Sequence, residues 1–135
     1  MWVNQEEIFH HSINLDDEGN IWVASPMFPY SKYVCKFTKK FGFHDNAITK
    51  LNVDGQILYI KSILELLLEN KVLNPSDIFI ENDSIHLNDI EPVTEDTKYW
   101  RKGDLFISIK HKSAIMHYRP STNELINYIK GPFYQ

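Results

Sequence analysis

The feature that most constrains this fold is a series of short strand patterns that occurs twice in the same order. A histidine-headed strand comes first, followed by a turn-led strand, an Ala-Ile strand and a closing strand. "HHSI" corresponds to "HLNDI", "GNIWVAS" to "GDLFISI", and "AITKLNVDGQILYI" to "AIMHYRPSTNELINYI". Four antiparallel strands in chain order make up one propeller blade. We therefore predict an all-β fold, an antiparallel β-propeller fragment of about two four-stranded blades.

One segment departs from the strand pattern. "KSILELLLENKVL" (61–73) is too continuous and too rich in leucine for a half-buried strand. Ser62 followed three residues later by Glu65 is typical of a capping box at a helix start. We predict one short inserted helix near 63–70, which the following "NPSD" would end.

The repeats set the domain organisation. Blade-like repeats are expected at about 8–61 and 84–130, with a helical insert at 62–78. The whole chain, 1–135, would then be a single partial β-propeller domain. A small sandwich built from the same eight strands is the alternative all-β fold. Two blades leave sheet edges open, and open edges favour pairing with another copy of the chain.

Composition narrows the classes of partner. A formal net charge of -4 argues against nucleic acid, because phosphate binding needs clustered Lys and Arg. No apolar run reaches the length of a membrane span, so we expect no membrane partner. The single Cys35 excludes an internal disulfide framework. The N-terminus "MWVNQEEIFHH" has no pattern of a signal peptide, which predicts a cytoplasmic chain as given.

Four stretches together resemble the bacterial arylsulfotransferase-like proteins. They are "HHSINLDDEGNIWV", "DSIHLNDIEP", "GDLFISIKHKSAI" and "YRPSTNELINYIKGPF", and the resemblance runs from about residue 8 to 135. It implies a six-bladed propeller, of which this chain would be a partial or truncated member. It also implies transfer of a sulfuryl group from an aryl sulfate to a phenol through a sulfohistidine. No nucleotide donor or other cofactor is expected.

The resemblance also suggests the site residues. His11 corresponds to the family's early channel histidine, and His86 with Asn88 corresponds to its H-x-N pair. Because His86 repeats the position of His11, we expect both imidazoles to point into one channel, with His10 on the opposite face. The predicted catalytic residues are His11 and His86.

A basic residue completes the predicted site. The family's arginine ends an S-x-R strand, and here "SIK" places Lys110 at that position. A guanidinium can hold two sulfuryl oxygens in a fork, whereas an ammonium is a flexible point charge. We predict Asn88 and Lys110 as substrate-binding residues. The family's nucleophilic histidine follows a G-P/G stretch, whereas this chain ends at "KGPFYQ", so we expect weak or no transfer.

Other interpretations of these residues stay open. His11 and His86 could be structural, Asn88 and Asp89 could cap a turn, and the basic "KHK" (110–112) could be a solvated strand end. His11, His86 and a carboxylate such as Asp89 or Glu91 could bind a divalent metal, although the favoured interpretation has none. The chain could also be a non-catalytic propeller module for binding or assembly.

The remaining histidines and the aromatic residues are expected to have structural roles. His44 and His117 are predicted to be surface or packing residues. The aromatic residues on the repeated strands are predicted to form the core between blades. They are Trp22, Phe106, Tyr118 and Tyr128.

Overall fold

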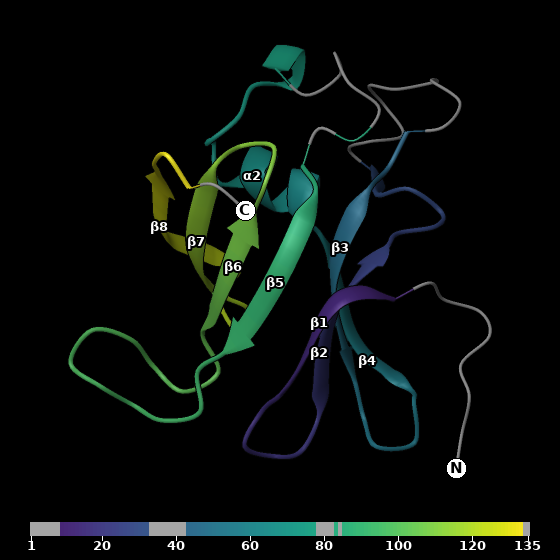
Figure 1. Cartoon of the computed structure of the whole chain (residues 1–135), viewed down its shortest axis with the longest axis vertical. Helices are drawn as coiled ribbons and strands as arrows, with labels where there is room; N and C mark the ends of the chain where they lie inside the picture. Colours follow the sequence, from purple (N-terminus) through teal and green to yellow (C-terminus); the bar gives the residue numbers. More distant parts are fainter. Residues whose placement is uncertain (1–8, 33–42, 78–82, 84, 134–135) are drawn as a thin grey trace.

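The computed structural model describes residues 9–32, 43–77, 83 and 85–133, and its strands form two open four-stranded sheets. The first sheet contains β1 (His10–Leu15), β2 (Ile21–Pro26), β3 (Asn46–Leu51) and β4 (Ile57–Ser62). The second contains β5 (Leu87–Pro92), β6 (Leu105–Ile109), β7 (Ala114–Arg119) and β8 (Glu124–Lys130). Helix α2 (Ile63–Glu69) and the single 3-10 turn η1 (Pro75–Asp77) connect the sheets. The predicted all-β, antiparallel architecture with one helix is confirmed (Figure 1).

Each sheet is a meander whose spatial order equals its chain order, as in a propeller blade (Figure 1). The first strands of the two sheets, β1 and β5, pack against each other. Asn14 of β1 donates to the backbone carbonyl of Ile90 at 2.9 Å and to the carboxylate of Asp89 at 3.0 Å. The hydroxyls of Tyr59 and Tyr118 form a further bond between the sheets at 2.8 Å. These open, adjacent sheets fit a propeller fragment.

A glycine lies in the turn before the second strand of each sheet. Gly19 before β2 and Gly103 before β6 have φ of +78° and +85°, and a Cβ at either position would meet no atom within 4 Å. The backbone conformation, not crowding, therefore favours glycine at both turns. Gly55 has φ of +79° in the β3–β4 hairpin, and an Asp-Gly pair such as Asp54-Gly55 is common in hairpin turns.

Helix α2 has recognisable signals at both ends. The Ser62 side chain accepts a hydrogen bond from the backbone N–H of Glu65 at 3.2 Å, which confirms the predicted cap. At the other end Lys71 has φ of +57°, its N–H bonds to Leu68 O, and the N–H of Val72 bonds to Leu67 O. This pattern is a Schellman motif with lysine in the usual glycine position. It ends the helix at Glu69, before the predicted "NPSD" stop.

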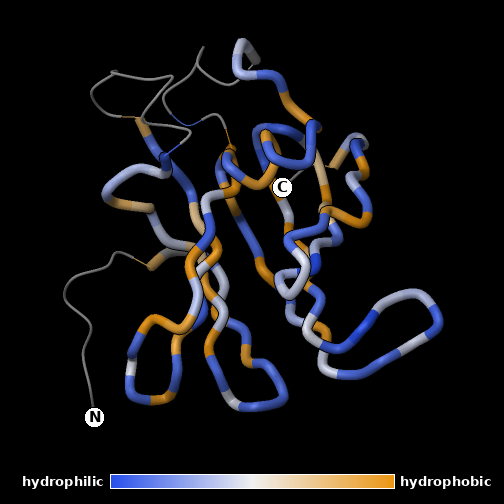
Figure 2. The backbone as a smooth tube through the Cα atoms, turned by 180° about the vertical axis from the view of Figure 1, so that it is seen from behind, coloured by the Kyte–Doolittle hydropathy of each residue, from blue (hydrophilic) through white to orange (hydrophobic). Residues whose placement is uncertain are grey.

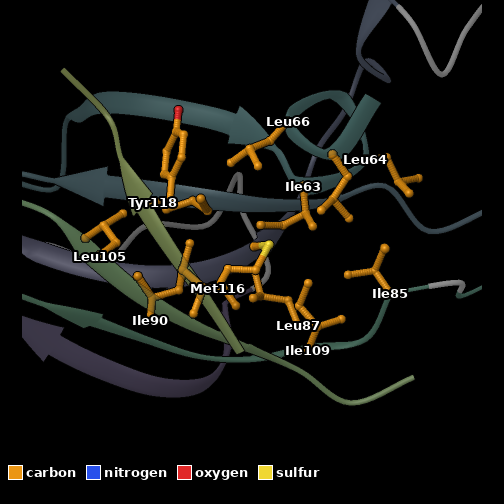
Figure 3. Packing of buried hydrophobic residues seen from close by; sticks show 14 of the residues in the cluster. Ile63, Leu64, Leu66, Ile85, Leu87, Ile90, Leu105, Ile109, Met116 and Tyr118 are labelled. Atoms are coloured by element: carbon orange, nitrogen blue, oxygen red, sulfur yellow. The ribbon is translucent and has the colours of Figure 1, made fainter. Parts of the chain in front are cut away.

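The hydrophobic core lies where α2 meets the strands of both sheets (Figure 3). Ile63, Leu64, Leu66 and Leu67 of the helix are fully buried, as are Met116 and several strand residues. Each such aliphatic side chain contributes about 1.5–3 kcal/mol through burial. In Figure 2 hydrophobic residues concentrate at this meeting point, whereas the loop over 93–104 is mostly hydrophilic. No helix of the described segments is long and apolar enough to cross a bilayer.

The predicted aromatic core is largely confirmed. Trp22 and Tyr118 belong to the buried cluster, and Tyr128 packs against it. Phe106 does not belong to it, because burial alternates along β6 and Phe106 lies on the less buried face. There its ring stacks on His117, with centroids 4.9 Å apart and an interplanar angle of 29°.

Candidate functional site: a histidine cluster between the two sheets

Three imidazole rings lie in a row between the two sheets. The centroids of His11 and His86 are 5.1 Å apart in an edge-on arrangement. The centroids of His86 and His111 are 4.9 Å apart, with their planes tilted by 40°. His86 is half-buried, whereas His11 and His111 are exposed. The expectation that His11 and His86 lie close together is confirmed.

The two repeated histidines share an unusual backbone conformation. His11 has φ of +65° and His86 has φ of +51°, in the left-handed region that few non-glycine residues adopt. Strand pairing is irregular beside each of them. The register shifts between His10 and Ile13 in β1, and between Leu87 and Asp89 in β5. Bulges of this kind redirect side chains and are frequent next to functional sites.

Asp83 holds two of the three rings. Its carboxylate accepts a hydrogen bond from Nδ1 of His86 at 2.8 Å and from the His86 backbone N–H at 2.9 Å. Its backbone carbonyl lies 2.6 Å from Nδ1 of His111. Burial raises the pKa of Asp83, but the hydrogen bonds from His86 and Asn46 outweigh this and hold it below its usual value. The carboxylate is therefore ionised at neutral pH.

These contacts fix the tautomers of His86 and His111. A carboxylate and a carbonyl oxygen can only accept, so Nδ1 carries the proton in both rings. In a neutral imidazole the other nitrogen, Nε2, then has a free lone pair. Both rings thus present a lone pair suited to nucleophilic attack or to a metal ion.

The predicted substrate-binding residues flank the cluster. Asn88 lies in the β5 bulge, two residues from His86, and is half-buried. Lys110 is exposed directly after β6, and its backbone N–H donates to the carbonyl of His86 at 3.0 Å. The structure thus brings the Lys110 backbone beside the histidines. The roles assigned to both side chains remain predictions.

Two members of the cluster were not foreseen from the sequence. His111 was interpreted as part of a solvated basic strand end, yet its ring lies against His86. Asp83 had no assigned role, although the spacing Asp-x-x-His allows an aspartate to bond the backbone three residues ahead. Asp89, considered as a turn cap or metal ligand, instead accepts hydrogen bonds from Ser12 and Asn14 across the sheets.

The buried His117 belongs to a separate polar network. Its Nε2 lies 2.7 Å from the carboxylate of Asp104, which also receives two hydrogen bonds from Arg119 at 2.7 and 2.8 Å. Burial raises the pKa of Asp104, but these partners and the Arg101 N–H outweigh it and lower the pKa to about 2. All of these groups are mutually satisfied, so the predicted packing role of His117 fits the structure.

A larger cleft lies at the other end of the first strands. Its volume is about 690 Å³, and its walls include Asp16, Trp22, Lys50, Tyr59 and Arg101. Asp16 directly follows the end of β1, whereas His11 lies near its start. None of the clustered histidines lines this cleft. The histidine cluster is therefore a site separate from this cleft.

Comparison with known proteins gives one match. The model of a protein family described as Arylsulfotransferase (ASST) matches residues 3–134. Searches of curated proteins and of solved structures each found no match. The family model covers nearly the whole chain and agrees with the all-β fold of two four-stranded sheets. The chain belongs to the arylsulfotransferase (ASST) family.

Proposed function

We propose that the histidine cluster binds the sulfuryl group of an aryl sulfate and transfers it, slowly, to a phenol. The observation that carries this proposal is the 5.1 Å separation of the His11 and His86 rings, of which His11 lies near the start of β1 and His86 directly before β5. One sulfuryl group is small enough to contact both rings. Membership of the family supports the reaction class.

The chemistry assigns a different part to each residue. Sulfuryl transfer depends on positioning and on stabilising negative charge at the non-bridging oxygens. His11, the Asn88 amide and the Lys110 ammonium offer donors for those oxygens. A lysine holds an anion less rigidly than the forked arginine guanidinium, so we expect weak transfer.

His86 is the best candidate for the nucleophile. Its Nδ1–H donates to the Asp83 carboxylate, which leaves Nε2 with a lone pair. Attack of Nε2 on sulfur would break the bond to the aryl oxygen and release a phenolate. Asp83 would stabilise the positive charge that then develops on the ring, as the aspartate of a catalytic triad does. In the second step the acceptor phenol attacks the sulfur of the sulfohistidine, and the bond between sulfur and Nε2 breaks. The proton of the acceptor goes to the phenolate that was released in the first step.

Release of nitrophenol from 4-nitrophenyl sulfate in the presence of phenol tests this proposal. We expect slow release by the wild-type chain, loss of release in His86→Gln, and an unchanged rate in the control His44→Gln. His44 is exposed and lies outside the cluster. Positioning groups alone recover only part of a rate enhancement, so the residual rate in His86→Gln should be close to background.

Binding is measured separately by titrating 4-nitrophenyl sulfate into each protein. We expect weaker binding in His11→Gln and His86→Gln than in His44→Gln. The wild type could bind 4-nitrophenyl sulfate without releasing nitrophenol, with binding lost in His11→Gln and His86→Gln. That result would favour a non-catalytic binding module with the same site. Equal binding by all four proteins would contradict the assigned site.

A further inference from the structure

A second chemistry fits the same end of the second sheet. Asp83, His86 and His111 each offer one potential metal-ligating atom, and these three atoms lie within 4.8 Å of one another. Among the segments that the structure describes, this is the one group of at least three His, Cys, Asp or Glu residues so arranged. Two imidazoles and one carboxylate are a common ligand set for zinc.

We propose that Asp83, His86 and His111 form a binding site for a divalent transition-metal ion such as Zn²⁺. This set differs from the metal site considered from the sequence. Asp83 is the carboxylate ligand in place of Asp89 or Glu91, and His111 replaces His11. Asp89 is engaged with Asn14 across the sheets. The proposal goes beyond sulfuryl transfer, although it shares His86 and Asp83 with the site proposed for that reaction.

The distances are compatible with chelation. Nδ1 of His86 and Oδ2 of Asp83 are 2.8 Å apart, so both can reach one ion at about 2.1 Å from each. The ion would take the place of the proton that these two atoms now share. Two tetrahedral ligands of one zinc ion lie about 3.4 Å apart, so atoms within 4.8 Å of one another need to close by at most about 1.4 Å.

The third ligand and its surroundings support the site. The carbonyl of Asp83 holds Nδ1 of His111, which leaves Nε2 of that ring with a lone pair for the ion. Asn46 donates to the other carboxylate oxygen of Asp83 at 3.0 Å, and this second contact orients the ligand.

Imidazole favours borderline metals, so Zn²⁺ and Co²⁺ are suitable probes. Calorimetric titration of the chelator-treated chain with Zn²⁺, without aryl sulfate, measures affinity and stoichiometry. Visible absorption of the Co²⁺ form reports coordination by protein ligands. We expect one ion per chain and an affinity at least about 10-fold weaker in His86→Gln and in His111→Gln.

His111→Gln is the decisive variant, because the side chain is exposed and its removal leaves the core intact. His44→Gln removes an exposed histidine outside the ligand set and should bind Zn²⁺ as the wild type does. Failure of the wild type to bind Zn²⁺, or binding equal to that of His111→Gln, overturns the site. Because no aryl sulfate is present, this result is distinguishable from failure of sulfuryl transfer.

Discussion

His86 shows how one residue is held in an unfavourable conformation. Its φ is +51°, yet its N–H and Nδ1 bond to Asp83 and its carbonyl accepts from Lys110. A left-handed non-glycine residue costs about 1–2 kcal/mol, and it persists where neighbouring contacts determine it. His11 also has a positive φ, of +65°, so two of the three clustered histidines share this strained conformation.

The sequence could indicate the repeated histidines but not their partners. His11 and His86 stand at matching places in two similar strands, and that pattern is visible without a structure. His111 lies in the turn after β6, where "KHK" has no periodicity to place its ring against His86. Asp83 lies outside both repeats, so its role depends on a backbone path that no local pattern specifies.

The Asp104 network predicts a loss of stability in acid. The pKa of Asp104 is about 2 in the folded chain, below the ordinary value of 3.8. A lowered folded-state pKa means that the unfolded chain binds the proton more readily. The stabilisation is thus fully present above about pH 4 and is lost as the pH falls through about 2. Denaturant unfolding of Asp104→Asn should depend less on pH in this window than that of the wild type.

Two further variants make this measurement decisive. Asp54→Asn changes a carboxylate in an exposed turn and should keep the pH profile of the wild type. Arg119→Gln retains the Asp104 carboxylate but removes the two hydrogen bonds from the guanidinium, so the acid loss should begin at higher pH. An unchanged profile in Arg119→Gln would show that Asp104 does not control acid stability.

At the scale of elements, the two sheets differ in the side-chain contacts that hold their third strands, β3 and β7. Lys50 of β3 pairs with Asp16 at 2.8 Å and lies over the Trp22 ring, whereas the corresponding His117 of β7 bonds to Asp104. Both arrangements join the third strand of a sheet to a carboxylate in the segment between the first and second strands. Strand periodicity predicted the two sheets. It could not show that a lysine in one sheet and a histidine in the other each contact a carboxylate.

Helix α2 offers a prediction about its C-terminus. Lys71 is exposed and has φ of +57° at the position where Schellman motifs favour glycine. Lys71→Gly should therefore raise the free energy of unfolding by about 1 kcal/mol, as measured by denaturant titration. Lys71→Ala removes the same charge but keeps a Cβ, so it should give no such gain. Equal stabilisation by both variants would assign the effect to the charge instead.

At the scale of the whole molecule, one face of the second sheet contributes to the shared core and the other face carries exposed apolar side chains. The core joins α2, β2, β3 and the second sheet into one cluster. On the far side of the second sheet, Trp100, Phe106, Ile115 and Ile129 line a hollow of about 320 Å³. In a closed propeller each blade face packs on a neighbouring blade. The prediction from the sequence concerned open sheet edges, which the two separate four-stranded sheets retain.

The open face predicts self-association of the chain in solution. Tyr99 is 68% exposed, Ile129 55% and Trp100 36%, which makes an apolar surface that water disfavours. We expect the sedimentation coefficient to rise with protein concentration, and Ile129→Lys to shift the chain towards monomer. Thr122→Lys adds the same charge in an exposed turn and should leave association unchanged. Burial of these side chains is the driving force that we invoke for pairing through this face. A wild-type chain that stays monomeric at every concentration would therefore contradict it.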